Sequence, residues 1–146
     1  MPFAPVTAAP ATTPKTLGPV SIGLPGNSGA LQSAVGTSEC LDVPGASHTN
    51  GTDVEIWTCN GATNQHWTHA ASGELQVYSP GTKCLATNGT AAVIDACAGQ
   101  QWTFNPDGTI STGGQCLEVP GGATTDGTFL DVGTCNGSAS QRWSFR

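Results

Sequence analysis

The sequence predicts an all-β protein made of three similar repeats of about 38 residues. Three observations support this prediction: short motifs that recur at a fixed interval, two cysteines in each repeat, and apolar residues that alternate with a period of two. The composition agrees, because only 10% of the 146 residues are charged, whereas there are 20 glycines and 10 prolines. Coiled coils and long amphipathic helices need more charged and aliphatic residues than this.

The repeats are defined by three markers that occur three times in the same order. Gly-Thr recurs at intervals of 38 residues, and a cysteine follows eight positions after each of these glycines, at Gly51 and Cys59, Gly89 and Cys97, and Gly127 and Cys135. Each repeat opens with Cys-Leu, at Cys40, Cys84 and Cys116, and closes with Gln-x-Trp, at Trp67, Trp102 and Trp143. Three ordered markers in triplicate are not expected by chance.

The six cysteines predict three disulfides. Fifteen connectivities are possible for six cysteines, and the threefold symmetry selects the pairing within each repeat, namely Cys40–Cys59, Cys84–Cys97 and Cys116–Cys135. Closing each short loop stabilises the fold by roughly 3 kcal/mol, and it implies an oxidising compartment, so we expect secretion. Zinc sites prefer C-x2-C pairs, which the sequence lacks. We therefore assign no metal and no other cofactor.

Strands are expected just before the second cysteine of each repeat. The aliphatic residues there alternate and should face the interior: Val54 and Ile56, Ala92 and Ile94, and Leu130 and Val132. Their neighbours on the opposite side are Glu55 and Trp57, Val93 and Asp95, and Asp131 and Gly133. Each repeat has room for about four short strands, and closure of the sheet would remove its exposed edges. The sequence thus predicts a closed threefold β structure.

The N-terminal residues read as a spacer. Residues 1–16 are rich in proline and threonine, which is typical of an extended linker, so we expect a linker at 1–16 and the domain at 17–146. This favours a module with a covalently linked catalytic domain upstream, although a short tail of a standalone protein fits as well. The net charge of -6 without a basic cluster disfavours nucleic acid and anionic membranes as partners. We expect a monomer.

The repeated motifs resemble those of ricin B-type lectin domains, known in enzymes as family 13 carbohydrate-binding modules. The resemblance covers residues from about 37 to 146 and rests on Cys-Leu-Asp, on a strand ending in Trp-x-Cys, and on Asn-Gln-x-Trp. It implies a β-trefoil with up to three sugar sites, one in each repeat. It also implies that each site draws on an acid after the first cysteine, on a polar residue and an aromatic before the second cysteine, and on the closing Asn-Gln.

Repeat one has the complete set of site residues: Asp42, Glu55, Trp57, Asn64 and Gln65. An indole can stack on the apolar face of a sugar ring while charged acceptors bind its hydroxyls. Glu55 stands where the family commonly has glutamine, and a carboxylate only accepts hydrogen bonds. Alternatives stay open: Asp42 could cap the following turn, Trp57 could be half-buried, and Gln65 could be structural. If the acids bind as anions, binding should weaken in acid.

The other two repeats have lost part of the set. Repeat two has apolar or mismatched residues throughout, at Ala86, Val93, Asp95 and Gly99, and we expect no binding there. Repeat three keeps Glu118, Asp131 and Gln141 but has Gly133 in place of the aromatic and Ser140 in place of the asparagine, so we expect weak or absent binding there. Phe129 could replace the missing ring only if its loop folds over. The closing tryptophans occur in all three repeats, which indicates core packing.

Three functions are compatible with these residues. The first is a non-catalytic module of a secreted glycoside-active enzyme, for which the resemblance implies a saccharide ligand containing galactose, arabinose or xylose. The second is a standalone secreted lectin, which would favour several intact sites. The third is catalysis by an acid pair such as Asp42 and Glu55, which the resemblance argues against. The sequence therefore predicts a carbohydrate-binding protein that is not an enzyme.

Overall fold

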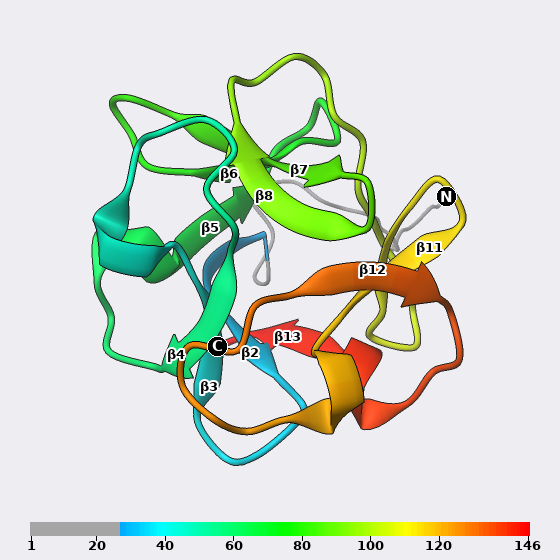
Figure 1. Ribbon diagram of the computed structural model, residues 1–146. Coiled ribbons are helices and arrows are strands. Elements are labelled where there is room, and N and C mark those ends of the chain that lie inside the picture. The colour runs from blue at the N-terminus through cyan, green and yellow to red at the C-terminus, as the bar shows by residue number, and fades with distance from the viewer. Residues whose placement is uncertain (1–26) are drawn as a thin grey trace, which may run out of the picture.

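The computed structural model describes residues 27–146, and the predicted linker at 1–16 lies outside this range. Twelve strands form this described part of the chain, four in each repeat (Figure 1). Repeat one contributes β2 (Ser28–Ser33), β3 (Glu39–Asp42), β4 (Glu55–Thr58) and β5 (His66–His69). Repeat two contributes β6 (Leu75–Val77), β7 (Lys83–Asn88), β8 (Ala91–Asp95) and β9 (Thr103–Phe104). Repeat three contributes β10 (Ile110–Thr112), β11 (Gln115–Glu118), β12 (Asp131–Thr134) and β13 (Trp143–Phe145).

Between residues 27 and 146, four short 3-10 helices connect the strands: η2 (Pro44–Ala46), η3 (Thr63–Gln65), η4 (Pro120–Gly122) and η5 (Ala139–Gln141). Gly45 in η2 and Gly121 in η4 have φ values of 60° and 66°. Glycine adopts this left-handed conformation without steric cost, which explains Pro-Gly at the same point of repeats one and three. Within the described part of the chain, no helix is long and apolar enough to cross a membrane.

The first and last strands of the repeats form a barrel. β2 pairs with β5, β5 with β6, β9 with β10, and β13 with β2, all antiparallel. Within repeat three, an isolated bridge between Thr109 and Arg142 connects the first strand to the last. Within repeat two, the Trp102 amide donates to the Gly73 carbonyl at 2.9 Å and makes the corresponding connection. Because the last strand of the chain pairs with the first described one, the sheet closes on itself and protects its edges.

The middle strands of each repeat form three hairpins, β3–β4, β7–β8 and β11–β12. Their registers match: Asp42 faces Glu55, Ala86 faces Val93, and Glu118 faces Asp131. A barrel of six strands capped by three hairpins, in threefold arrangement, is a β-trefoil. The predicted all-β fold and its three repeats are therefore confirmed.

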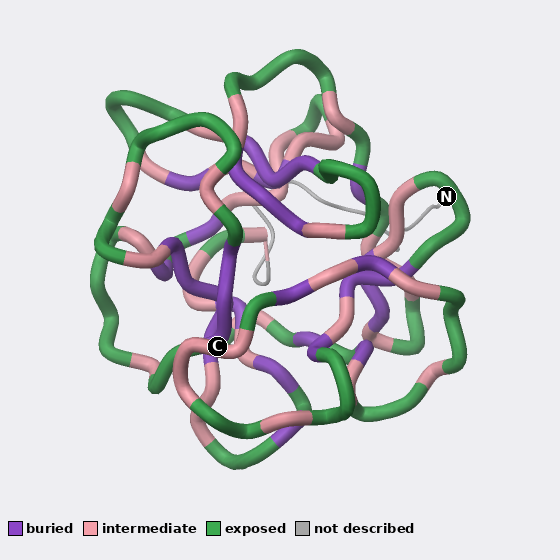
Figure 2. The backbone as a smooth tube through the Cα atoms, viewed as in Figure 1, coloured by how far each residue is buried: buried purple, intermediate pink, exposed green. Residues whose placement is uncertain are grey.

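A ring of backbone hydrogen bonds joins the three repeats where β4, β8 and β12 meet around the centre of Figure 1. The amide of Val54 donates to Ala92 at 3.0 Å, that of Ala92 to Leu130 at 3.1 Å, and that of Leu130 to Val54 at 3.1 Å. These residues are 38 positions apart in the sequence. Each repeat is thus bonded to both of the others, and the residues predicted to face inward are buried there (Figure 2).

The closing tryptophans pack in this core, as predicted. Trp67, Trp102 and Trp143 are buried, and each indole N–H donates to the carbonyl of the leucine that opens its own repeat, at 3.0, 2.8 and 3.1 Å. The bond satisfies the single polar atom of a buried indole. It also explains why Cys-Leu and Gln-x-Trp occur together in each repeat.

The three predicted disulfides, Cys40–Cys59, Cys84–Cys97 and Cys116–Cys135, are all present in the structure. We expect that replacing both cysteines of the Cys40–Cys59 pair with serine lowers the free energy of unfolding by about 2–4 kcal/mol. Denaturant titration of the wild type and the double variant measures this loss. An unchanged unfolding midpoint would show that the bridge does not constrain the unfolded chain.

Candidate functional site

A cavity of about 230 Å³ opens on repeat one, between the β3–β4 hairpin and the η3 turn. Its lining residues are Asp42, Gly45, Glu55, Trp57, Asn60 and Asn64. Four of these are residues that the sequence predicts for the site. Gly45 and Asn60 were not predicted, because a turn glycine and a loop asparagine have the same sequence signal whether or not they line a site.

Two carboxyl groups form the floor of the cavity. Asp42 on β3 and Glu55 on β4 face each other in register and are only 3% and 7% exposed. Residues directly opposed in an antiparallel pair point to the same face of the sheet. The register therefore brings the two acids together, although 12 residues separate them in the sequence.

Asp42 is fixed by two amide groups. Its Oδ2 accepts hydrogen bonds from Asn64 Nδ2 at 3.2 Å and from Gln65 Nε2 at 2.9 Å. Gln65 is fully buried, donates also to the Thr58 carbonyl, and accepts from the Asn60 amide at 2.9 Å. Gln65 thus lies beneath the cavity as a support for Asp42, rather than at its surface. The η2 turn has no side-chain cap, so Asp42 does not cap it.

Glu55 is the protonated member of the pair at neutral pH. Burial, the hydrogen bond and negative charge of Asp42, and the charge of Asp126 together raise the pKa of Glu55 to about 8. The pair therefore holds its proton on Glu55 at neutral pH. The expectation that Glu55 binds as an anion is therefore wrong at neutral pH. A protonated carboxyl group can donate a hydrogen bond, as the amide of glutamine does.

Trp57 forms the exposed wall of the site. Its side chain is 42% exposed, in agreement with its predicted place on the outward side of the strand. It lies against Gly127 of repeat three, where an added Cβ would be 3.8 Å from Trp57 Cζ3. A flat apolar ring next to buried polar groups can stack on the C–H face of a sugar while its hydroxyls bind the acids.

The acid pair has the wrong spacing for glycoside hydrolysis. Glycosidases hold their two carboxyl groups about 5–10 Å apart, on either side of the scissile bond. Asp42 and Glu55 are hydrogen-bonded to each other, which leaves no room for a bond to be cleaved between them. This geometry supports binding by the pair rather than catalysis.

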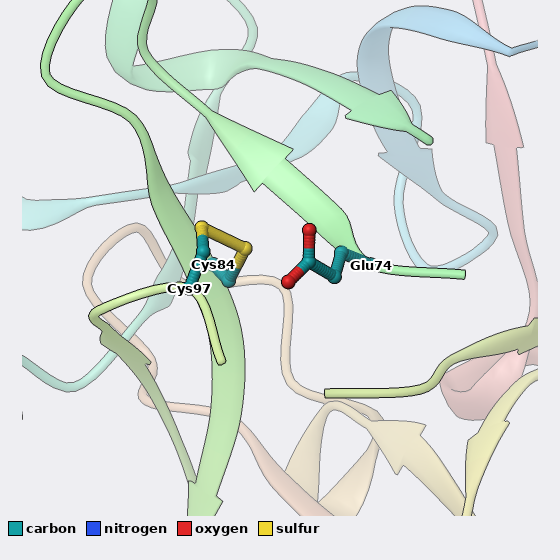
Figure 3. A group of neighbouring side chains, drawn as sticks. All are labelled: Glu74, Cys84 and Cys97. Carbon is teal, nitrogen blue, oxygen red and sulfur yellow. A yellow bond between two sulfur atoms is a disulfide. The ribbon is translucent and has the colours of Figure 1, made fainter. Parts of the chain in front are cut away.

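Repeat two has no comparable site. Ala86 and Val93 fill the positions of the acids and are 8% and 2% exposed, while Asp95 accepts a hydrogen bond from the next amide. Glu74 lies near the Cys84–Cys97 disulfide (Figure 3) and accepts the Gly99 amide at 2.8 Å. Sulfur atoms in a disulfide are not thiolates and do not bind metal, so this group is not a metal site.

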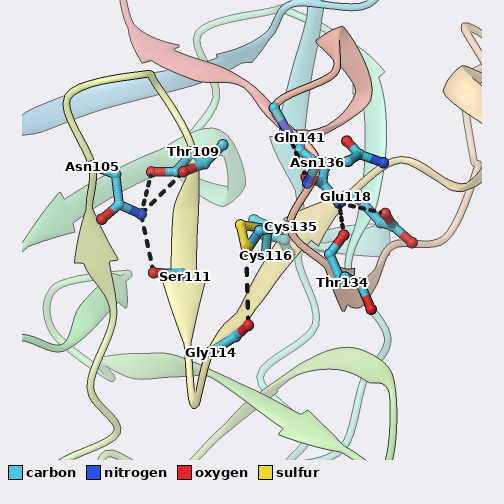
Figure 4. Close-up of a disulfide and its surroundings, with 12 residues drawn as sticks. Asn105, Thr109, Ser111, Gly114, Cys116, Glu118, Thr134, Cys135, Asn136 and Gln141 are labelled. Carbon is cyan, nitrogen blue, oxygen red and sulfur yellow. Dashed lines mark hydrogen bonds between the residues drawn. A yellow bond between two sulfur atoms is a disulfide. The ribbon is translucent and has the colours of Figure 1, made fainter.

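Repeat three keeps the acid pair but blocks its own site. Gln141 Nε2 donates to Glu118 at 2.9 Å and to the Thr134 carbonyl at 2.8 Å (Figure 4). The Glu118 carboxyl lies over Gly133, since an added Cβ there would be 2.6 Å from Glu118 Oε2. Glu118 therefore occupies the space above Gly133, the residue that corresponds to Trp57 of repeat one. Burial and Glu118 raise the pKa of Asp131 to about 6.

Phe129 does not replace the ring of repeat three. It pairs instead with Glu55 of repeat one in an isolated antiparallel bridge, and its side chain is 55% exposed. The sequence could not predict this, because the pairing of residues from different repeats depends on how the three hairpins meet.

A larger hollow of about 480 Å³ lies beside the first site, lined by Thr63, His66, Thr68, Gln76, Tyr78, Ser79 and Thr82. Tyr78 is already engaged, because His48 stacks on its ring at 3.8 Å and its hydroxyl donates to the Ser47 carbonyl at 2.9 Å. Its lining has no acid and no tryptophan, and its tyrosine is engaged, so this hollow lacks the features that distinguish the site in repeat one.

The fold and the site together define a lectin-type β-trefoil, with one well-formed cavity that combines an exposed indole and buried acids. The chain belongs to the ricin-type β-trefoil lectin family, whose model matches residues 27–143. It is thus a carbohydrate-binding lectin domain.

Two curated relatives are much longer than this chain. It is 33% identical over 117 residues to the ribosome-inactivating protein PMRIPt of Polygonatum multiflorum, which covers 70% of this chain and 18% of that protein. It is 41% identical over 54 residues to the glucan endo-1,3-beta-glucosidase of Cellulosimicrobium cellulans, which covers 37% of this chain and 10% of that enzyme. The chain therefore spans less than a fifth of the length of either relative.

Solved structures share the fold. The C-terminal half of an earthworm R-type lectin, solved with GalNAc, matches with a TM-score of 0.71 and 13% identity, over 80% of this chain and 95% of that chain. The designed threefold-symmetric protein ThreeFoil matches with a TM-score of 0.64 and 24% identity, over 80% and 96% of the two chains. At these identities the likeness concerns the fold alone.

Proposed function

We propose that this domain is a non-catalytic carbohydrate-binding module of a secreted glycoside-active enzyme. It binds polysaccharide containing galactose, arabinose or xylose, mainly through repeat one. One sugar residue stacks on Trp57, while its hydroxyls bind Asp42, Glu55 and Asn64. Glu118, Asp131 and Gln141 of repeat three contribute weak binding at most.

The observation that supports this proposal is the asymmetry among three hairpins of the same register. Only repeat one combines an exposed ring with an acid pair that is open to a cavity. In repeat two the acids are replaced by a buried apolar pair, and in repeat three Glu118 folds over the glycine. A scaffold that needed these residues for stability would keep them in every repeat.

Two arguments support a module of a secreted enzyme: the weak binding expected of a single site, and the disulfides. A single shallow site of this kind binds with a Kd between about 10 µM and 1 mM, and tethering to an enzyme makes such weak binding useful because it raises the effective concentration. The three disulfides favour secretion. An antibody against the domain should detect a secreted protein much larger than 14.7 kDa; detection at 14.7 kDa would favour a standalone lectin.

The binding function is tested with the purified domain on immobilised galactan, arabinan and xylan, with cellulose for comparison. We expect retention on at least one of the first three polymers and release by its free monosaccharide. The Ala86→Ser variant is a matched control, because it alters the same register position in the hairpin without a site and should be retained equally. Lack of retention on all three polymers would contradict the proposed ligand class.

A further inference from the structure

Two large apolar side chains are exposed in the described part of the chain, and both lie next to Glu55. Trp57 is 42% exposed and Phe129 is 55% exposed. Within residues 27–146, the other large aliphatic and tryptophan side chains are buried in the core. Exposed aromatic side chains that gather at one place often mark a binding surface.

The pairing of β4 with repeat three puts Phe129 on the face of the site. Phe129 is the antiparallel partner of Glu55, so the two side chains point to the same side. The flanking amides fix this register, since Ile56 donates to Thr128 at 3.0 Å and Leu130 to Val54 at 3.1 Å. Glu55 and Phe129 do not bond to each other, and pairs of this kind bring side chains closest together.

Asp42, Glu55 and Phe129 thus form a row across three neighbouring segments, with Glu55 in the middle. Trp57 lies two residues along β4 from Glu55 and leans on Gly127, which lies two residues from Phe129. Two residues of extended chain span about 7 Å. The two aromatic side chains therefore flank the acid pair at a separation on the scale of one sugar ring.

The segment that bears Phe129 is held firmly against β4. Asp126 accepts hydrogen bonds from the Thr58 amide at 2.9 Å and from the Thr58 hydroxyl at 2.8 Å. The Thr128 hydroxyl donates to the Thr125 carbonyl at 2.7 Å. A ring held on a fixed backbone loses little conformational freedom when a ligand stacks on it.

The other two junctions between repeats lack this arrangement. The matching bridges pair Asp53 with Val93 and Ala91 with Asp131. Asp53 and Ala91 hold the positions that correspond to Phe129, and neither is aromatic. A ring is therefore present at this position only at the junction that adjoins the site in repeat one. The scaffold does not require an aromatic at this position, which leaves recognition as its role.

We propose that Phe129 forms a second stacking subsite, so that the site binds two adjacent sugar residues of a chain, one on Trp57 and the next on Phe129. This inference rests on the proposed function and specifies its ligand as an internal or terminal segment of an oligosaccharide. Phe129 comes from a different repeat than Trp57, so the binding surface crosses the boundary between repeats.

Isothermal titration calorimetry tests the proposal with two probe series, xylose to xylotriose and galactose to galactotriose. For the series that binds, we expect the wild type to gain about fivefold or more in affinity from the monosaccharide to the disaccharide. Phe129→Ala should lose this gain, with monosaccharide binding and melting temperature unchanged, because an exposed ring contributes little to stability. Asp53→Ala, at the matching bridge beside repeat two, should behave as the wild type.

The outcomes separate the two proposals. Monosaccharide and disaccharide binding of equal strength in the wild type, or an undiminished gain in Phe129→Ala, would overturn the second subsite and leave the proposed function standing. Wild-type protein that binds neither series, nor any of the three polymers named above, would overturn both. A gain restored by Phe129→Tyr would support stacking as the cause, since tyrosine keeps the ring.

Discussion

Replacing Trp57 with alanine is expected to abolish measurable sugar binding and to leave the fold intact. Removing an aromatic anchor from a binding site typically costs 2 kcal/mol or more, about 30-fold in affinity, which shifts a Kd of about 10 µM to 1 mM to about 0.3 to 30 mM, too weak for retention on immobilised polysaccharide. The side chain is 42% exposed, so the free energy of unfolding should change by no more than about 1 kcal/mol. Retention on immobilised polysaccharide and thermal unfolding measure the two effects.

Trp67 is the matched control in the same repeat. It is fully buried and donates to the Leu41 carbonyl at 3.0 Å. Trp67→Ala removes this bond and leaves a cavity, so we expect a loss of about 3–5 kcal/mol in the free energy of unfolding. Equal destabilisation by both substitutions would contradict the assignment of Trp57 to the site and of Trp67 to the core.

Sugar binding is expected to weaken as the pH rises through about 8, which is the opposite of the acid sensitivity predicted from the sequence. Below its raised pKa, Glu55 carries the proton that links it to Asp42; above that pKa the proton is lost, and two carboxylates face each other on the floor of the cavity, with Asp126 nearby. Losing a buried hydrogen-bond donor costs about 1–3 kcal/mol, or roughly 5- to 150-fold in affinity. Titrations of one saccharide from pH 5.5 to 9.5 measure the change.

Glu55→Gln separates this cause from a general effect of pH. The amide keeps a donor without a titrating group, so the variant should bind at pH 6 nearly as well as the wild type and keep that affinity at pH 9.5. Asp131→Asn makes the corresponding change in repeat three and should leave the wild-type profile unaltered. An alkaline loss that persists in Glu55→Gln would show that another group is responsible.

The same acids should make the fold less stable in alkali. Burial and neighbouring acids raise the pKa of Glu55 to about 8, of Glu39 to about 7 and of Asp131 to about 6. In the unfolded chain these groups titrate near pH 4, so the folded state binds more protons between pH 4 and 8. Stability is therefore complete below this window and falls as the pH rises through it. The melting temperature at pH 9 should lie about 5 °C or more below that at pH 5.

The sequence was sufficient for the scaffold because each structural role occurs three times. The 38-residue interval, the local disulfides and the buried Leu41 and Trp67 could all be inferred from repetition and alternation, and the structure confirms them. The exposure of Trp57 followed from the same alternation. Features that occur in all repeats report on the fold, and features that occur once report on the site.

The electrostatics of the site could not be inferred in this way. Alternation places Glu55 on the outward side of its strand, but it does not show that Asp42 lies opposite or that the pair is only 3–7% exposed. Nor does it show that Phe129 pairs with Glu55 across the boundary between repeats. Both depend on contacts between segments that are distant in the sequence, and these determine protonation and the shape of the surface.

The bonds from Thr58 to Asp126 have a consequence for redesign of the molecule. They hold the loop 125–129, which belongs to repeat three by sequence, against β4 of repeat one. Copying residues 40–67 into all three lobes would therefore not yield three equal cavities, unless each copy also received a neighbour with Asp126, Gly127 and Phe129 at the corresponding positions. The transferable unit of this lectin is one hairpin together with the loop that adjoins it.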